Sequence, residues 1–168
     1  MSRKISVTLS CGECCAKSTH VLYKTIWGEV AENRDLVFSD KINRLICPAC
    51  GNVAFPATSL MYTNCDLCFA VYYEPEHDPQ IDADNNNLAA RELGQRRGAM
   101  HLFDAIRLPE WEQFKEMIRK YERGDLVTET YKLKQARQLV PPPKKGCMGV
   151  VIMAAVVCLA VLLIRIIR

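Results

Sequence analysis

The 168-residue sequence has no glycine-rich phosphate loop and no Gly-x-Ser-x-Gly motif. The first absence argues against a P-loop nucleotide-binding protein, and the second argues against a serine hydrolase built on a nucleophile elbow. Acidic pairs occur at Glu74/Glu76 and Asp82/Asp84, but they fall in a polar stretch where carboxylates are ordinary surface groups. No motif therefore identifies a small-molecule substrate or a hydrolytic reaction.

The main part of the chain also lacks an excess of basic charge. The formal net charge of +3 comes from 22 Lys+Arg and 19 Asp+Glu. Four of the basic residues, Lys144, Lys145, Arg165 and Arg168, flank an apolar run at the C-terminal end, so residues 1–143 hold 18 basic and 19 acidic groups. A nucleic-acid-binding domain usually carries a basic face. We therefore expect no nucleic-acid partner.

The first residues lack the apolar stretch of a secretory signal, whereas residues 146–164 contain no charge at all. As a helix, this C-terminal run would be about 28 Å long, close to the ~30 Å hydrocarbon core of a bilayer. We predict a single-pass transmembrane tail anchor over residues 146–168, in contact with the lipid bilayer. Lys144 and Lys145 favour an orientation that leaves the N-terminal domain in the cytoplasm.

Hydrophobic periodicity divides the rest of the chain into three segments. Residues 1–80 form a β-rich part with strand-like runs at 4–10, 19–27, 41–46, 53–62 and 69–75. Residues 85–139 form a helical part that is expected to pack on the strands. Residues 140–145 form a Pro/Lys linker, and residues 74–87 are polar and acidic and are expected to be a linker or surface loop.

Two helices are predicted with identifiable ends. A short helix capped by Asn87 is expected after residue 87, and a stronger one is expected from Pro109 to Gly124. A further, weaker helix is expected from Asp125 to the prolines. The stripe Trp111, Phe114, Ile118 and Tyr121 should pack on the sheet. The predicted fold class is α+β: a small antiparallel β zinc-ribbon-like domain with packed helices, plus a single C-terminal transmembrane helix.

The nine cysteines carry the chemistry of this sequence. Six of them form three Cys-x-x-Cys pairs: Cys11/Cys14, Cys47/Cys50 and Cys65/Cys68. In a cytosolic protein such pairs indicate a metal site or thiol catalysis, because disulfides are rare there. Two pairs can complete a tetrahedron around Zn²⁺, with Zn–S bonds of about 2.3 Å. Pro48 and Gly51 give the middle pair the backbone chemistry of a tight turn.

Spacing alone leaves open which pairs share an ion. Cys47/Cys50 with Cys65/Cys68 leaves 14 residues between the pairs, near the common spacing of about 15–20. Cys11/Cys14 with Cys47/Cys50 leaves 32, which requires a sheet folded between them. His20, His77 and His101 could complete a site only in principle.

The run VTLSCGECC…WGEV…INRLICPACGN…SLMYTNCDLCFAVYYEPE resembles the CpXC domain, and PEWEQFKEMIRKYERGDL resembles its downstream helical segment. The resemblance covers about residues 7 to 127. It implies a metal-binding, ribbon-like domain whose ligands are Cys11, Cys14, Cys47 and Cys50. Cys65 and Cys68 are then second-choice ligands, and we expect them to be spare thiols. The first motif departs from the family in lacking a proline and in being followed by Cys15.

The expected cofactor is therefore a structural Zn²⁺ ion, and the expected function is a non-enzymatic binding or adaptor module for a protein partner at the cytoplasmic face of a membrane. The alternative is a membrane-held thiol-disulfide redox protein. A reactive Cys-x-x-Cys usually has its first thiol at a helix N-terminus. The residues that follow Cys50 and Cys68 favour extended chain instead, which argues against the redox alternative.

Overall fold

The computed structural model describes residues 2–139. Residues 1–134 belong to one compact unit. The predicted linker and transmembrane segment, at 140–145 and 146–168, lie outside the described residues. Within the described part of the chain, no helix is both long enough and apolar enough to cross a membrane.

A four-stranded sheet forms the centre of the compact unit. Its strands lie in the order β3 (Thr25–Trp27), β6 (Leu60–Asn64), β7 (Phe69–Tyr73) and β8 (Ile106–Leu108). β6 and β7 are antiparallel neighbours joined by a short turn, and Tyr62 lies opposite Val71 in their register. The two outer pairs, β3–β6 and β7–β8, are parallel.

This mixed sheet differs from the antiparallel one predicted from the sequence. Parallel neighbours need a crossover of a dozen or more residues, and the chain provides two. The first crossover runs from β3 to β6 through α1 (Ala31–Phe38), and the second runs from β7 to β8 through α2 (Pro79–Asn86) and α3 (Leu88–Arg97). The predicted helical part thus contributes a strand to the sheet, and the predicted β-rich part contains a helix.

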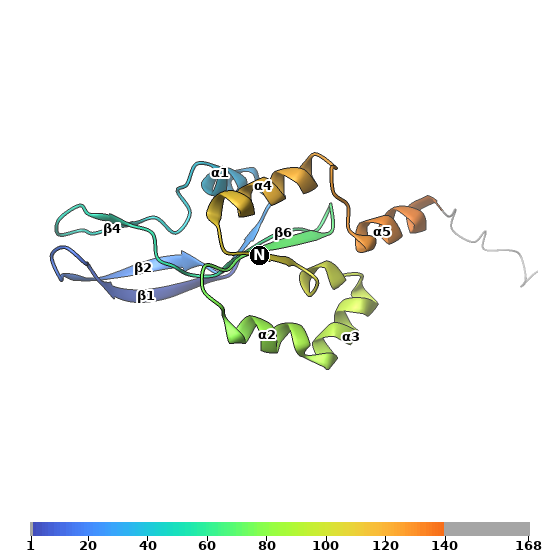
Figure 1. Cartoon of the computed structure of the whole chain (residues 1–168), viewed down its shortest axis with the longest axis horizontal. Helices are drawn as coiled ribbons and strands as arrows, with labels where there is room; N and C mark the ends of the chain where they lie inside the picture. Colours follow the sequence, from blue (N-terminus) through green and yellow to red (C-terminus); the bar gives the residue numbers. More distant parts are fainter. Residues whose placement is uncertain (1, 140–168) are drawn as a thin grey trace, which may run out of the picture. The chain divides into compact units, whose positions relative to one another are not determined.

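Helix α4 (Trp111–Glu122) lies along one side of this sheet, and α2 and α3 lie along the other (Figure 1). Phe114 and Ile118 of α4 are fully buried, and Trp111 and Tyr121 pack against the same core. The predicted stripe is confirmed. The buried members of the core come from α1, the loop that follows it, α4 and the sheet: Ile26, Val37, Ile42, Leu60, Tyr62, Phe69, Val71, Phe114 and Ile118.

The helix capped by Asn87 is also confirmed, since the Asn87 side chain accepts a hydrogen bond from the N–H of Ala90. The loop predicted over residues 74–87 is wrong for α2. Asp78 caps that helix by accepting from the N–H of Gln80, Pro79 occupies its first turn, and Ile81 is its buried anchor. The last helix, α5 (Glu129–Leu139), begins after Asp125 as predicted.

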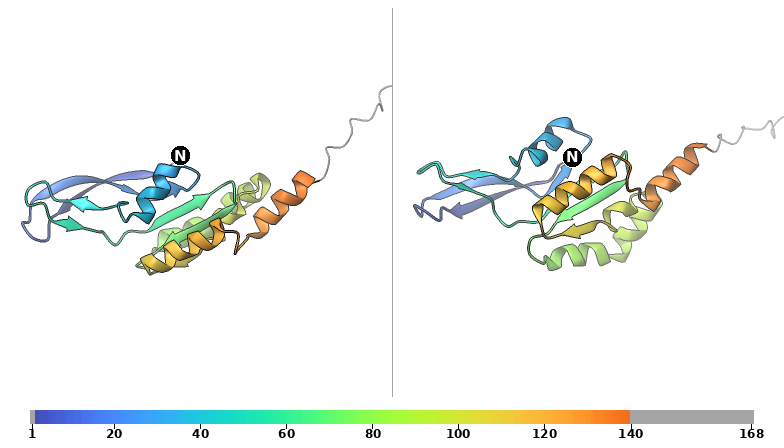
Figure 2. Two further views of the ribbon diagram at one scale, coloured as in Figure 1. Left: turned by 90° about the horizontal axis from the view of Figure 1, so that it is seen from above. Right: turned by 45° about the horizontal axis from the view of Figure 1, so that its top comes forward.

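Two narrow β-ribbons extend from one end of the sheet, and we call them the arm (Figure 2). β1 (Lys4–Ser10) pairs antiparallel with β2 (Lys17–Tyr23), and β4 (Leu45–Ile46) pairs antiparallel with β5 (Val53–Ala54). β2 leads directly into β3, and β5 leads through residues 55–59 into β6. The arm is therefore a continuation of two neighbouring sheet strands.

Polar contacts join the two ribbons at the base of the arm and also join the sheet to its helices. The Asn43 amide accepts from the N–H of Tyr23 at 2.7 Å and donates to the Tyr23 carbonyl at 3.0 Å. Within the core, the buried Tyr62 hydroxyl donates to Glu122 at 2.7 Å, and Arg34 pairs with the same carboxylate at 2.7 Å. Sheet, α4 and α1 are thereby joined at one point.

The core packing gives a first testable prediction. Phe114→Ala removes a fully buried ring and should lower the free energy of unfolding by about 3–5 kcal/mol. Leu133→Ala, at a side chain that is 59% exposed, should change it by less than about 0.5 kcal/mol. Chemical denaturation of the two variants measures both values, and equal effects would contradict the packing of α4 on the sheet.

Candidate metal centre

The first cysteine loop, residues 11–16, joins β1 to β2 and carries Cys11 and Cys14. The N–H of Cys11 donates to the carbonyl of Ala16 at 2.9 Å, which closes the ribbon. The N–H of Cys15 donates back to the carbonyl of Cys11, also at 2.9 Å. These two bonds curl the chain so that the two thiols of the loop point to the same side.

The second cysteine loop, residues 47–52, repeats this pattern between β4 and β5. The N–H of Cys47 donates to the carbonyl of Asn52 at 2.8 Å, and the N–H of Gly51 donates back to the carbonyl of Cys47 at 2.9 Å. The two loops therefore have the same hydrogen-bond pattern at the same internal positions. Each presents its first and fourth residue, both cysteines, at the tip of the arm.

The four sulfur atoms of Cys11, Cys14, Cys47 and Cys50 lie within 4.8 Å of one another. The shortest separations run between the loops: Cys11 to Cys50 and Cys14 to Cys47 are each 3.6 Å. A disulfide would require about 2.05 Å. A tetrahedron with Zn–S bonds of 2.3 Å has edges of about 3.8 Å. The spacing therefore suits four ligands around one ion and does not suit two disulfides.

Backbone N–H groups favour thiolates inside both loops. The N–H groups of Cys14 and Glu13 are the main cause that lowers the pKa of Cys11 to about 6. The N–H groups of Cys50 and Ala49 likewise lower the pKa of Cys47. The N–H of Asn52 favours the Cys50 thiolate, but hydrogen bonds with the Cys14 and Cys47 thiols, together with desolvation, raise its pKa to about 12.

These shifts show how negative charge is distributed in the cluster. The pKa is lowered for one cysteine in each loop, Cys11 and Cys47, and raised for Cys50, whose thiolate is disfavoured so close to the others. Four thiolates at these separations repel one another strongly unless a cation lies between them. The site can therefore hold a divalent ion in sulfur coordination and would lose protons as it does so.

Cys15 takes the position in the first loop that Gly51 takes in the second. Its backbone has a φ of 57°, and Gly51 has a φ of 74°. Both residues donate the hydrogen bond that closes their loop, and both need the left-handed conformation that glycine adopts without a steric penalty. Cys15 is exposed and stands outside the four-cysteine group. Cys15 therefore contributes its backbone conformation to the loop and is not a fifth ligand.

The third pair, Cys65 and Cys68, lies in the turn between β6 and β7 and does not join the cluster. Desolvation is the first cause that raises the pKa of both thiols, and the Glu29 carboxylate raises that of Cys65 further. Glu29 also accepts a hydrogen bond from the N–H of Cys65, and Thr128 donates to the carbonyl of Cys68 at 2.6 Å. The pair is part of a hydrogen-bonded turn.

The histidines also lie outside the cluster. His20 hydrogen-bonds to Ser18 at 2.6 Å, and His77 lies beside Glu74 and Asp82. His101 is buried in the short 3₁₀ turn η1 (Met100–Leu102), and burial lowers the pKa of its imidazole. Of the residues that the structure describes, only the four cysteines of the two loops form a group with metal-site spacing.

Comparison with known proteins identifies one family. A family model described as CpXC protein matches residues 9–131. The match contains both cysteine loops, the whole four-stranded sheet and helix α4. No curated protein and no solved structure matches the chain.

The shared backbone geometry of the two loops gives a second prediction. Gly51→Ala places a side chain at positive φ and should destabilise the protein by about 1–2 kcal/mol. Cys15→Gly should instead stabilise the protein by up to about 1 kcal/mol, because the backbone strain of a non-glycine residue at positive φ is relieved.

Gly12→Ala is the matched control. A Cβ at Gly12, as at Gly51, meets no atom within 4 Å, but Gly12 is not among the residues with positive φ. Its effect should stay within about 0.5 kcal/mol. Thermal or denaturant unfolding compares the three variants, and a Gly51→Ala effect no larger than that of Gly12→Ala would contradict the role of the left-handed position.

Proposed function

The chain belongs to the CpXC family, and we propose that its four clustered cysteines bind one structural Zn²⁺ ion that holds the arm together. The observation that carries this proposal is the position of the four sulfur atoms, all within 4.8 Å of one another on two loops of the same backbone form. Soft sulfur ligands in a tetrahedral arrangement suit Zn²⁺ or an iron–sulfur centre. Two Cys-x-x-Cys loops on β-ribbons are typical of structural zinc.

The arm has little else to stabilise it. The β4–β5 ribbon contains only two residue pairs, and an isolated two-stranded ribbon is at best marginally stable in water. Structural zinc contributes about 10–16 kcal/mol in small model peptides. When bound, the ion would supply the link between the two ribbon tips that their short hydrophobic faces do not supply.

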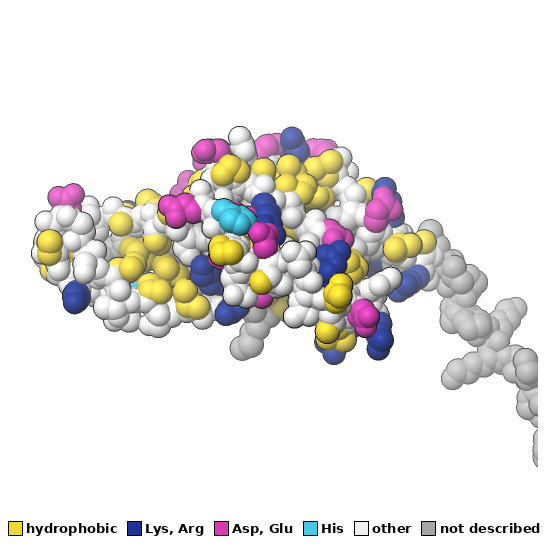
Figure 3. Space-filling model, turned by 60° about the horizontal axis from the view of Figure 1, so that its bottom comes forward, with side chains coloured by type: hydrophobic (Ala, Val, Ile, Leu, Met, Phe, Trp, Pro, Cys, Tyr) yellow, Lys and Arg dark blue, Asp and Glu magenta, His cyan; other side chains and the backbone are white. Residues whose placement is uncertain are grey.

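The proposed biochemical role is that of a non-enzymatic binding or adaptor module. Four protein thiolates leave no open coordination position for a water or substrate, which argues against a zinc hydrolase. Hydrophobic side chains gather on the arm in Figure 3. Three strongly exposed apolar residues of the two ribbons and the segment after β5 are Val21 (59%), Ile46 (55%) and Phe55 (61%). Exposed apolar groups of this kind favour a protein partner.

Thiol-disulfide exchange is the second candidate, because the pKa of Cys11 is lowered to about 6 and its thiolate forms readily. Two features argue against it. The cysteine loops lead into strands β2 and β5, so neither first thiol lies at a helix N-terminus. The shortest sulfur separations run between loops and not within a Cys-x-x-Cys pair.

The metal proposal gives a third prediction. The full chain, purified in detergent under reducing conditions, should contain about one zinc per molecule, with four thiols protected until a chelator is added. Cys47→Ser removes a buried ligand and should abolish zinc binding and disorder the arm. Metal analysis and amide hydrogen exchange of β1, β2, β4 and β5 measure these effects.

Cys65→Ser is the matched control, since it changes one thiol of a Cys-x-x-Cys pair outside the cluster. It should leave the zinc content unchanged. Metal-free protein whose thiols oxidise reversibly in pairs would contradict the proposal and favour the redox candidate. Iron in place of zinc would contradict the choice of ion.

The proposed module is held at the cytoplasmic face of a membrane by residues 146–168. Support comes from the sequence alone: the run from Gly146 to Ile164 is uncharged, and Lys144 and Lys145 precede it. A protein partner at the membrane surface would then meet the domain at high local concentration.

The membrane proposal gives a fourth prediction. Leu159→Asp places a charge in the middle of the run, at a cost to insertion of about 2.5–3.5 kcal/mol. The variant should shift from the membrane fraction into the alkaline-extractable fraction. Leu133→Asp, at an exposed position of α5, should remain in the membrane fraction. Equal extraction of both variants and of the unmodified chain would contradict anchoring by this segment.

A further inference from the structure

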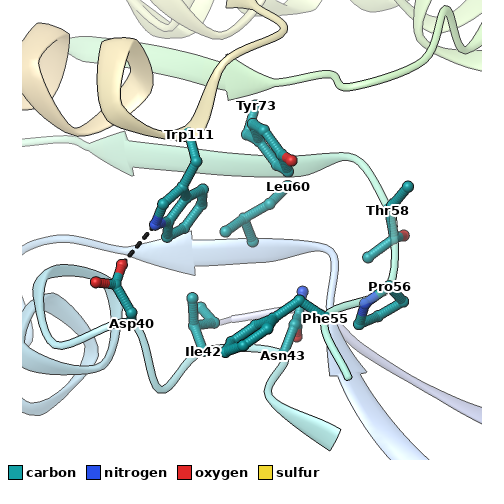
Figure 4. Close-up of a pocket in the computed structure, with 10 residues that line it drawn as sticks. Asp40, Ile42, Asn43, Phe55, Pro56, Thr58, Leu60, Tyr73 and Trp111 are labelled. Atoms are coloured by element: carbon teal, nitrogen blue, oxygen red, sulfur yellow. Dashed lines mark hydrogen bonds between the residues drawn. The ribbon is translucent and has the colours of Figure 1, made fainter. Parts of the chain in front are cut away.

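A pocket of about 360 Å³ lies at the base of the arm, where residues 55–58 face the start of α4. Its walls are mostly apolar or aromatic (Figure 4), formed by Ile42, Phe55, Pro56, Leu60, Tyr73 and Trp111. No part of the proposed zinc site enters it. Sequence reasoning assigned Trp111 to the core and did not detect the pocket, because its walls come from four separate segments.

One wall of the pocket is fixed in place. The Trp111 indole N–H donates to the Asp40 carboxylate at 2.5 Å. The Trp111 ring stacks on Phe114 at 5.0 Å between ring centroids and meets Tyr73 edge-on at 5.1 Å. A ligand would therefore meet preformed aromatic surfaces and would not have to order them, which reduces the entropic cost of binding.

The opposite wall is open to solvent. Phe55 lies just beyond β5 and is 61% exposed, although its ring borders an apolar pocket. The Tyr73 hydroxyl makes no hydrogen bond to any residue in the described part of the chain. A hydroxyl at the rim of an apolar pocket is a ready donor for a carbonyl group of a ligand.

Charged groups give the pocket a polarity. Asp40 and Glu112 both bond to Lys115, at 2.9 and 2.7 Å, and Glu110 precedes Trp111 at the start of α4. Arg119 also acts on the Asp40 carboxylate, so three carboxylates stand against two cationic groups and this end keeps an excess of one negative charge. At the other end, Lys24 donates to the Thr58 hydroxyl at 2.8 Å. A ligand with a cationic end is complementary to the Trp111 side.

From these features we infer that the pocket binds a proline-rich segment of a partner protein that carries basic residues next to its prolines. Polyproline II segments dock on aromatic-lined grooves because their backbone is already ordered. They make no internal hydrogen bonds, so their carbonyls can accept from a donor such as Tyr73. The basic residues would lie at the Asp40 end. The inference rests on the proposed binding function and names where the partner docks and what it is made of.

The test is a titration with a synthetic hexapeptide of four prolines followed by two lysines. The protein is the full zinc-loaded chain in detergent, carrying Trp27→Phe so that Trp111 is its single tryptophan. Saturable change in Trp111 fluorescence is expected. Replacing the prolines of the peptide by alanine, or its lysines by glutamate, should weaken binding at least roughly tenfold, because stacking or charge complementarity is lost.

Two variants test the pocket itself. Phe55→Ala should weaken peptide binding roughly tenfold, while Val21→Ala, at an equally exposed apolar residue of the arm, should change it less than about twofold. Asp40→Asn keeps an acceptor for Trp111 and a residue that tolerates the φ of 55°. It removes the charge and should flatten the dependence of the affinity on salt.

The outcomes separate this inference from the metal proposal. The inference that the pocket binds the peptide is overturned if zinc-loaded protein gives no saturable response, or if Phe55→Ala and Val21→Ala bind equally. Either result leaves the zinc proposal unaffected. Absence of zinc in the purified chain overturns the proposed function instead. If alanine at Pro141–Pro143 of the full chain raises the affinity for the peptide, the linker of the chain itself occupies the pocket, and the inference of a partner is overturned.

Discussion

The position of four thiols at the tip of the arm is the constraint on which the arrangement of the arm depends. β1–β2 and β4–β5 are separate ribbons, paired strand to strand only within themselves. At the base, the side-chain amide of Asn43 ties the segment before the second ribbon to the first ribbon through two hydrogen bonds with the backbone of Tyr23. At the tip, the Sγ atoms of one loop lie 3.6 Å from those of the other. The two ribbons are therefore joined at both ends of the arm.

The thiol cluster cannot be explained by packing alone. Three of its four cysteines are exposed or half-exposed, so little hydrophobic energy is gained by gathering them. The backbone N–H groups around Cys11 and Cys47 favour negative charge there, whereas Cys50 resists it. Such a set of groups is balanced either by protons that remain on some thiols or by a cation that replaces them. The tetrahedral spacing suits the cation.

The elements that sequence reasoning predicted correctly are those with local signals. The stripe of Trp111, Phe114, Ile118 and Tyr121 repeats at helical spacing, and Asn87 is a local cap. Helix α2 was missed although Asp78 and Pro79 form a start signal, because the acidic composition of the stretch outweighed it. The parallel pairs β3–β6 and β7–β8 join segments more than thirty residues apart, which no local pattern specifies.

The grouping of Cys11 and Cys14 with Cys47 and Cys50 is likewise not specified by any local pattern. The spacing of the cysteines left the choice of pairs open, and the family resemblance favoured this one. The structure brings the two distant loops together, so that the four sulfur atoms lie within 4.8 Å of one another.

The cluster and the pocket are connected by the chain itself. The second cysteine loop ends at Asn52, β5 follows at Val53–Ala54, and the next residue, Phe55, forms the exposed wall of the pocket. Any loss of order in the second loop therefore removes the support of that wall. Coupling free energies are reciprocal. If an ordered second loop favours binding at residues 55–58, a ligand bound there favours the ordered loop by the same free energy. Under the two proposals together, an ion at the tip would contribute to binding of the inferred partner without touching it, because the ion would fix residues 55–58.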